Sequence, residues 1–316
     1  MRDPEAGSRP GPSFALFAEH ILKSGQSDRG ALFLMAVTVT LWGASWVVMK
    51  YMSTLIGPFD LVMVRYAIAF VTLLAVALVS RQSLAFPPFW PMLGIAVFQT
   101  TAFQCLCQLA LVSGGAGHVV MLAYTMPFWV VLFAWLLLGE RPGQRHIAGL
   151  VFAAVGLVLI IAPWEGLGSL AGSLIALAGG ASWGLGTVLA KRMFQRHASN
   201  VLGTTTWQML MGALLTWPVT QIFPQQDAVW APELFWGLAY MGVVASALGW
   251  WMWLSVVRRV SATVAGMSGL GVPVLTVILA WLLLAERPTP LELVGIASIM
   301  TGLVLVNLGF ARRQFA

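Results

Sequence analysis

Ten apolar stretches of nearly uniform length recur along this chain of 316 residues. A helix needs about 20 apolar residues to cross the hydrocarbon core of a bilayer. We place the stretches near residues 31–50, 59–79, 89–110, 118–138, 146–162, 169–190, 200–222, 234–256, 262–284 and 290–309. Charged residues make up only 9% of the chain, which is too few to cover a soluble surface. The sequence therefore predicts an all-α integral membrane protein with ten transmembrane helices.

The basic residues predict how these helices are oriented. If the N-terminus is cytoplasmic, 14 of the 17 Lys and Arg fall on the cytoplasmic side, namely Arg2, Arg9, Lys23, Arg29, Arg81, Arg141, Arg145, Lys191, Arg192, Arg196, Arg258, Arg259, Arg312 and Arg313. The outer loops then hold Arg287, while Lys50 and Arg65 lie within or at the end of a helix. Cytoplasmic loops of membrane proteins are enriched in Lys and Arg. We therefore expect both termini in the cytoplasm, and we interpret the formal charge of +6 as this bias rather than as a nucleic-acid surface.

An internal repeat runs through the chain. Ala134–Pro142 reads AWLLLGERP and Ala280–Pro288 reads AWLLLAERP, so eight of nine positions match at an offset of 146 residues. The same offset relates Pro127 to Pro273, Met121 to Met267, Gly149 to Gly295 and Gly156 to Gly302. At an offset of 141, Trp42, Gly43 and Lys50 correspond to Trp183, Gly184 and Lys191. A register kept over such a distance indicates a duplicated unit rather than chance similarity among leucine-rich helices.

The repeat also predicts the domain organisation. Each unit holds five helices, which gives a first repeat at 31–162 and a second at 169–309, with cytoplasmic tails at 1–30 and 310–316. Because five is odd, the second unit enters the membrane from the opposite side and the two units are inverted. Inverted repeats are common in secondary transporters, where the exchange of roles between the halves offers a route to alternating access.

With these features the chain resembles the drug/metabolite transporter superfamily, and within it the EamA-type exporters. The resemblance rests on the Trp-Gly…Lys segment in the first helix of each half and on the proline and the Gly/Ala-Glu-Arg-Pro end of the fourth. It covers residues 31–309 and implies a bacterial inner-membrane protein. A central substrate cavity would be lined mainly by the first, third, fourth, sixth, eighth and ninth helices. Amino acid exporters, including aromatic amino acid exporters of the YddG type, have a similar layout.

The chain departs from one branch of this superfamily. Small multidrug exporters use a glutamate in the first helix, whereas residues 31–50 contain no Asp or Glu. This difference speaks against proton/drug antiport by that mechanism, and it favours a facilitative or differently coupled exporter.

Polar and aromatic residues at helical spacing predict which faces line the cavity. The expected lining residues are Trp42, Thr101, Gln104, Gln108, Tyr124, Trp183, Ser246, Trp250 and Ser268. Three of them, on the third helix, form one stripe because residues three or four apart share a helix face. The alternative is that small and hydrogen-bonding residues only pack the helices together, as the spacing of Gly180 and Gly184 indicates. A lining of amides, hydroxyls and indoles suits neutral amphipathic or aromatic solutes and zwitterions.

Four ionisable residues are candidates for a charge role. Arg65 lies inside a predicted helix, where a charge is a functional hypothesis by default. It has the chemistry to bind a substrate carboxylate, but we favour snorkelling or an ion pair, because Asp60 near the outer surface is only five residues away. His118 is able to titrate near neutral pH, although a lone interfacial histidine is more often merely tolerated. For Glu140 and Glu286, which close the fourth helix of each half, we favour structural anchoring over gating.

Pro127 and Pro273 fall in the middle of the fourth helix of each half. A proline inside a helix removes a backbone donor and kinks the helix. The kink is either static or used for gating, and the equivalent positions of the two prolines favour a shared mechanical role.

Together these patterns predict an exporter of aromatic or neutral amino acids that works by alternating access, with a sugar, a nucleotide precursor or a drug-like compound as the alternative substrate. An integral membrane enzyme is the distant alternative, because the chain has no H-E-x-x-H or P-loop motif. Its G-A-S-W-G run at Gly180–Gly184 lies inside a predicted transmembrane helix, not at the strand-to-helix turn of a nucleophile elbow. We expect neither enzymatic activity nor a cofactor or metal. The expected partners are a small-molecule substrate and the lipid bilayer, and we expect no nucleic-acid partner. A monomer is one assembly that we expect.

Overall fold

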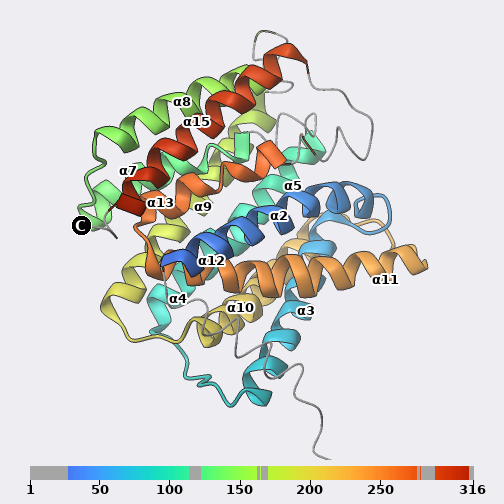
Figure 1. The fold of residues 1–316 in the computed structure, drawn as a ribbon. Coiled ribbons are helices and arrows are strands. Elements are labelled where there is room, and N and C mark those ends of the chain that lie inside the picture. The colour runs from blue at the N-terminus through green and yellow to red at the C-terminus, as the bar shows by residue number, and fades with distance from the viewer. Residues whose placement is uncertain are drawn as a thin grey trace, which may run out of the picture.

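The computed structural model of the chain describes residues 28–113, 122–161, 164, 170–275, 278 and 289–312. Its first half contains α2 (Asp28–Met52), α3 (Pro58–Val79), α4 (Phe89–Ile95), η1 (Ala96–Ala102), α5 (Phe103–Ser113), α7 (Met126–Leu138) and α8 (Gln144–Ile161). The second half contains α9 (Leu170–Arg196), α10 (Val201–Ile222), α11 (Pro232–Ala239), η3 (Tyr240–Leu248), α12 (Gly249–Arg259), α13 (Ala262–Ser268) and α15 (Pro290–Arg312). All regular elements of these described ranges are helices, and they form one bundle (Figure 1). His118 and Glu286 lie outside the described residues, and so does most of each expected tail.

The outside of the bundle is apolar. Four described helices are long and apolar enough to cross a membrane, namely Pro58–Val79, Phe89–Ala110, Leu170–Arg196 and Pro232–Arg259. Shorter apolar helices cover Phe33–Trp46, Met126–Leu138, Gln144–Ile160, Ala262–Leu275 and Pro290–Val306. Large side chains such as Trp90, Trp230 and Trp236 are more than two-thirds exposed. Because such a surface needs lipid as its solvent, the chain is a multi-pass membrane protein.

Local sequence signals explain where several helices begin and end. Asn200 and Ser261 accept hydrogen bonds from backbone N–H groups in the first turns of α10 and α13, at 2.8 and 3.2 Å. Ahead of α15, Thr289 and Glu292 bond each other's backbone N–H groups at 2.7 and 3.2 Å, which is a capping box. Gly139 ends α7 with a φ of 68°, a conformation that glycine adopts without strain.

The fourth helix of each half contains a short turn beside its proline. Pro127 lies in the first turn of α7, directly after a turn at residues 124–125. In the second half α13 ends at Ser268, a turn follows at residues 269–270, and Pro273 lies in the helical segment 271–275. The expected disturbance thus takes the form of a short turn beside each proline, and backbone bonds from Phe128 to Thr125 and from Val272 to Gly269, each 3.0 Å long, run across the two turns. A proline without a backbone N–H fits the first turn of a helix, and such a first turn follows each short turn.

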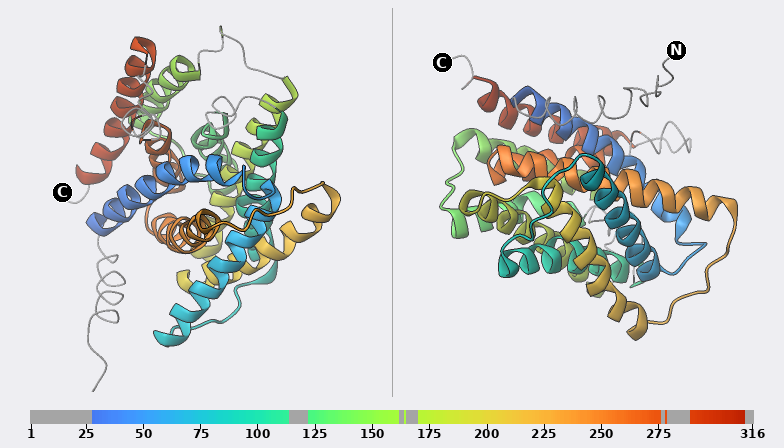
Figure 2. Two further views of the ribbon diagram at one scale, coloured as in Figure 1. Left: turned by 90° about the vertical axis from the view of Figure 1, so that its right-hand side faces the viewer. Right: turned by 90° about the horizontal axis from the view of Figure 1, so that it is seen from below.

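Helices α8 and α15 pack closely along one edge of the bundle (Figures 1 and 2). A Cβ on Gly156 would lie 2.5 Å from the carbonyl oxygen of Gly295, and a Cβ on Gly295 would lie 2.8 Å from that of Gly156. Gly149 and Gly302 stand in the same relation, at 2.9 and 2.6 Å. The backbones approach so closely that no side chain fits between them, as at other small-residue helix contacts in membranes.

Two hydrogen bonds between buried amide and hydroxyl side chains connect three helices inside the bundle. The Nε2 of Gln208 on α10 donates to the Oε1 of Gln99 on η1 at 3.1 Å, and the Nε2 of Gln99 donates to the Oγ1 of Thr187 on α9 at 3.0 Å. All three residues are fully buried. Side-chain hydrogen bonds of this kind hold helices together in lipid, where hydrophobic burial alone gives no reason for helices to associate.

We expect Gly156→Val to destabilise the protein by about 1–3 kcal/mol, because the added methyl groups overpack the contact between α8 and α15. Thermal unfolding in detergent micelles measures the effect. Val155→Leu is the matched control, since Val155 is exposed on the same helix and added volume there meets no neighbouring helix. Equal stability of the Gly156→Val protein and the control would contradict the close contact.

Candidate functional site

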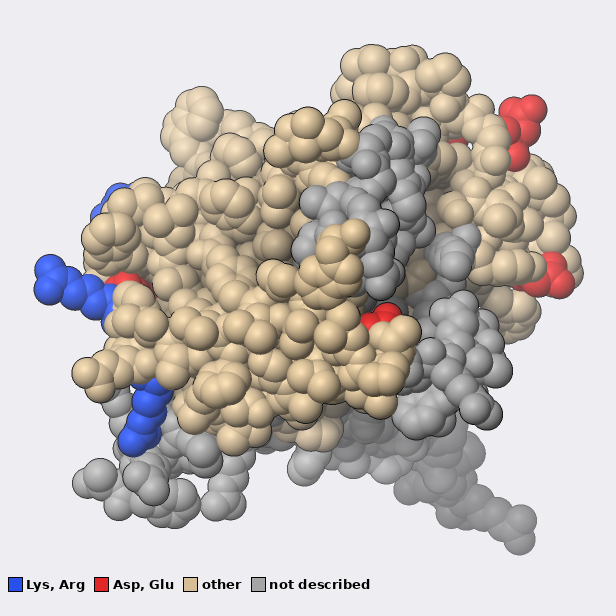
Figure 3. Space-filling model, turned by 90° about the horizontal axis from the view of Figure 1, so that it is seen from above, with Lys and Arg blue, Asp and Glu red and all other residues tan. Residues whose placement is uncertain are grey.

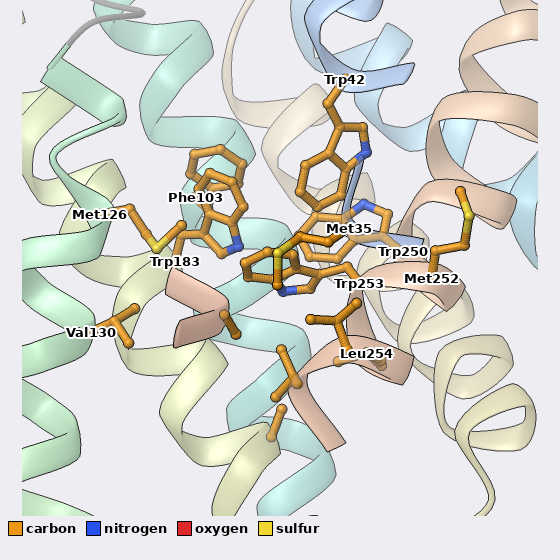
Figure 4. Close-up of a cluster of buried hydrophobic side chains, with 14 of the residues drawn as sticks. Met35, Trp42, Phe103, Met126, Val130, Trp183, Trp250, Met252, Trp253 and Leu254 are labelled. Carbon is orange, nitrogen blue, oxygen red and sulfur yellow. The ribbon is translucent and has the colours of Figure 1, made fainter. Parts of the chain in front are cut away.

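Four buried tryptophans from three helices meet near the centre of the bundle (Figure 4). They are Trp42 of α2, Trp183 of α9, and Trp250 and Trp253 of α12. The ring centroid of Trp42 lies 5.5 Å from that of Trp183, 5.1 Å from that of Trp250 and 5.5 Å from that of Trp253. Phe103 of α5 packs against Trp183 at 4.7 Å. Aromatic pairs at these separations attract each other beyond simple area burial, so the cluster joins the two halves of the chain.

The indole N–H groups of the cluster differ in their partners. The Nε1 of Trp42 donates to the carbonyl oxygen of Ala245 at 3.0 Å. Beside the cluster, the Nε1 of Trp46 donates to the Tyr124 hydroxyl at 2.6 Å. The Nε1 atoms of Trp183 and Trp253 are buried and have no hydrogen-bond partner among the described residues. A buried donor without a partner is costly, so these two N–H groups are the unsatisfied donors of the cluster.

A cavity of about 30 Å³ lies beside the cluster, lined by Trp42, Ser45, Trp46, Met49, Arg65, Phe103, Gln104, Tyr124, Trp183 and Trp250. That volume holds about two water molecules. A metabolite would need surrounding side chains or helices to move before it could enter. The cavity in this structure is therefore too small for a metabolite, and we call it contracted.

Some of the residues that the sequence predicts as cavity lining do line this cavity. Five of the nine expected lining residues contribute, namely Trp42, Gln104, Tyr124, Trp183 and Trp250. The other four do not line it. Ser246 is fully buried beneath Arg65, and the Oγ of Ser268 donates to the carbonyl oxygen of Val264 within its own helix. Thr101 and Gln108 belong to the third helix, with buried polar atoms that have no partner in the described part of the chain.

Besides Arg65, four lining residues were not among the nine expected: Ser45, Trp46, Met49 and Phe103. Trp46 and Met49 follow Trp42 at four and seven positions, which is one face of a helix. Extending the Trp42 face along α2 would have found them. Phe103 neighbours the predicted Gln104 and faces Trp183.

Arg65 is buried on α3 and forms part of the cavity wall. Its side chain is only 5% exposed, so it does not snorkel to the surface. Its Nε donates to the Oγ of Ser246 at 2.8 Å, and its guanidinium carbon lies 5.6 Å from the centre of the Tyr66 ring. Among the described residues no carboxylate pairs with it. The expected snorkelling or ion pair is thus not what the structure has.

Glu140 and Lys191 lie together at one end of the bundle, away from the cavity. The Nζ of Lys191 donates to the carbonyl oxygens of Arg258 and Val260, at 3.2 and 2.7 Å, and so caps the C-terminal end of α12. The carboxylate of Glu140 accepts long contacts from the backbone N–H of Ala262 at 3.4 Å and from Thr263 at 3.5 Å. The two charges thus hold opposite ends of the turn between α12 and α13, which fits structural anchoring for Glu140.

The chain belongs to the EamA-like transporter family. The model of this family matches twice, at residues 29–162 and again at 170–308. Together the two matches cover most of the chain. The class of protein is therefore a membrane transporter for small molecules.

Individual relatives agree with this class. The uncharacterized transporter YoaV of Bacillus subtilis is 26% identical over 291 residues, which cover 90% of this chain and 99% of YoaV. A probable amino-acid metabolite efflux pump of Salmonella typhimurium is 26% identical over 298 residues (90% of this chain, 97% of the pump), and its Escherichia coli namesake is 27% identical over 300 residues (90% and 96%). One solved crystal structure superposes with a TM-score of 0.77 at 21% identity, covering 92% of this chain and all of the other, which shows the fold alone.

We expect Lys191→Met to destabilise the protein by about 1–3 kcal/mol, because a near-isosteric side chain replaces a charged donor of two hydrogen bonds. Unfolding in detergent micelles checks this. Arg196→Met on the exposed end of the same helix is the control and should unfold as the unaltered protein does. If both variants unfold alike, the cap on α12 has no energetic importance.

Proposed function

We propose that this protein exports amino acids with aromatic or neutral side chains across the bacterial inner membrane, by alternating access through the tryptophan-lined cavity. The observation that carries the proposal is the cavity itself. Trp42, Trp183 and Trp250 present indole rings, while Gln104 and Ser45 add uncharged polar groups. An apolar pocket with a few convergent polar groups is typical of small-molecule sites.

An inverted-repeat architecture has support from the contact between α8 and α15. Gly149 and Gly156 correspond in sequence to Gly295 and Gly302, each 146 residues later. Gly149 packs against Gly302, and Gly156 packs against Gly295. Such reciprocal pairing is what an axis of two-fold pseudo-symmetry between antiparallel helices produces. We propose that this axis lies in the membrane plane and relates two five-helix units, within 31–162 and 169–309.

The π-helical segments are a second correspondence between the proposed units. Segment η1 covers residues 96–102, and a shift of 146 residues places it at 242–248, within η3. π-Helical turns are rare and frequently occur at functional sites. Both segments adjoin the cavity, since α5 follows η1 with Gln104 and α12 follows η3 with Trp250.

The short turns before Pro127 and Pro273 offer a mechanism for opening the contracted cavity. Tyr124, in the first turn, contributes to the cavity wall and accepts the indole hydrogen bond of Trp46. A helix that changes at this level from α-helical bonds to a turn with i→i+3 backbone bonds is able to swing one segment while the other stays packed. We propose that the two turns are the hinges of alternating access.

The charge distribution supports cytoplasmic termini. Figure 3 shows Lys and Arg gathered at the end of the bundle that carries the C-terminus in Figure 1, whereas acidic side chains also occur at the opposite end. Under the positive-inside rule the basic end faces the cytoplasm. Export, rather than import, and amino acids as cargo are supported by the names of the two efflux pumps that the chain resembles.

Transport into proteoliposomes tests the proposal. Purified protein is reconstituted, and labelled phenylalanine, tryptophan, leucine and alanine are offered with and without a pH gradient. We expect saturable uptake of aromatic or neutral amino acids above that of empty liposomes. Dependence on the gradient would distinguish coupled from facilitated transport. Absence of uptake for every amino acid, from protein shown to be folded, would contradict the proposed substrate class.

We expect Gln104→Ala to raise the KM for a transported amino acid by about tenfold, which corresponds to the loss of one substrate hydrogen bond. Trp183→Phe should weaken transport as well, because the phenyl ring keeps the packing but removes the free indole donor. Initial rates in proteoliposomes give the KM and kcat of each variant. Gln221→Ala is the control, since Gln221 is exposed and bonds its neighbour Thr220. Unchanged kinetics for both cavity variants would exclude this face as the binding site.

A further inference from the structure

Arg65 differs from every other charged group in the described part of the chain, because it is a buried cation in the wall of the cavity. Lys191, the other buried cation, has two backbone carbonyl oxygens as acceptors. Arg65 has one hydroxyl, the Oγ of Ser246. A cation inside a membrane protein is costly unless an anion or several dipoles compensate it, so its retention here calls for a compensating partner.

The contact with Ser246 orients the guanidinium group. The Ser246 hydroxyl donates its own proton to the carbonyl oxygen of Met241 at 2.7 Å, which leaves its lone pairs to accept from the Nε of Arg65 at 2.8 Å. The Tyr66 ring lies 5.6 Å from the guanidinium carbon. With Nε engaged, the two terminal amino groups have no acceptor among the described residues. An arginine held in this manner presents a planar fork that fits a carboxylate with two parallel hydrogen bonds.

The remainder of the wall defines what else the ligand must carry. Trp42, Trp183, Trp250 and Phe103 supply aromatic surface. Among the described residues the lining contains no Asp or Glu, so a substrate ammonium group finds no counter-ion there. It finds only aromatic faces and neutral oxygens, which attract a cation less strongly than a carboxylate does.

We propose that Arg65 anchors the carboxylate of the substrate, and that the cavity selects monocarboxylates with an aromatic or large apolar group, whether or not they carry an ammonium group. This inference rests on the proposed function, because it assumes that the substrate occupies this cavity. It goes further in one respect. The carboxylate is the required group and the ammonium is dispensable, so deaminated aromatic acids are ligands while amino acid amides are not.

Binding of three matched compounds to the purified full chain in detergent tests the anchor. Phenylalanine has both groups, 3-phenylpropionate lacks the ammonium, and phenylalaninamide lacks the carboxylate. Calorimetric titration should give comparable affinities for the two acids and at least tenfold weaker binding of the amide. Arg65→Gln should weaken both acids at least tenfold and leave the amide unchanged, and Arg65→Lys should restore part of the loss. Arg196→Gln, at an exposed position, is the control.

Ser246→Ala keeps the charge but removes its positioning contact, and it should weaken the acids by a smaller factor than Arg65→Gln. Each variant is first shown to be monodisperse and to unfold cooperatively. Equal binding of phenylalanine and its amide, or unchanged acid binding by the Arg65→Gln protein, would overturn the anchor while amino acid transport in proteoliposomes still stood. If none of the three compounds binds and no amino acid is transported, the proposed function fails, and the anchor fails with it.

Discussion

A polar group inside this bundle must find its partner within the protein, because lipid offers none. Many buried hydroxyls obey this constraint by bonding a carbonyl oxygen of their own helix, whereas several amide and charged groups do so through contacts between distant parts of the chain. Gln208, Gln99 and Thr187 bond in series across three helices. Lys191 caps the end of α12. These contacts, with the glycine-mediated packing of α8 on α15, specify how the helices fit together where hydrophobic burial does not discriminate between arrangements.

The cavity is one of the places in the described part of the chain where the same constraint is left incompletely met. The indole N–H of Trp183 has no described partner, and Arg65 has a single hydroxyl where a cation in lipid requires more. Both residues line one small space among aromatic rings. Donors that are unpaired in the empty site form hydrogen bonds when a suitable solute binds. A solute that lacks the matching acceptors leaves these donors unpaired, and this difference makes binding selective. Tyr124, in the turn before Pro127, forms part of the cavity wall, and the turns before Pro127 and Pro273 are the hinges that we propose for admitting a solute.

Much of the fold follows from the sequence by simple physics. Apolar stretches of membrane-spanning length contain the helices, and the offset of 146 residues anticipates both the glycine pairs of α8 and α15 and the equivalent turns of the fourth helices. We expected Pro127 and Pro273 to kink their helices, whereas the structure has a short turn beside each proline. A proline predicts a disturbance, but whether the backbone bends or forms a turn depends on the neighbours that replace its lost hydrogen bond.

The site is harder to predict, for two physical reasons. The expected stripe of Thr101, Gln104 and Gln108 assumes 3.6 residues per turn throughout, whereas Thr101 lies in the wider turn η1, which shifts the helical phase. The environment of Arg65 depends on Ser246, which is 181 residues away in sequence. Local sequence shows a charge in a helix, and only the packed structure shows that it is buried, oriented and without a carboxylate.

The most direct test of the account is the accessibility of the cavity from the two sides of the membrane. Ser45 in the cavity wall is replaced by cysteine in a protein whose own thiols, Cys105 and Cys107, are changed to alanine. A membrane-impermeant thiol reagent is then applied to right-side-out and to inside-out vesicles. Alternating access predicts that the new cysteine is modified from both sides and that transported solute slows the reaction. Modification from one side only, or from neither, would contradict a central cavity that opens in turn to each side.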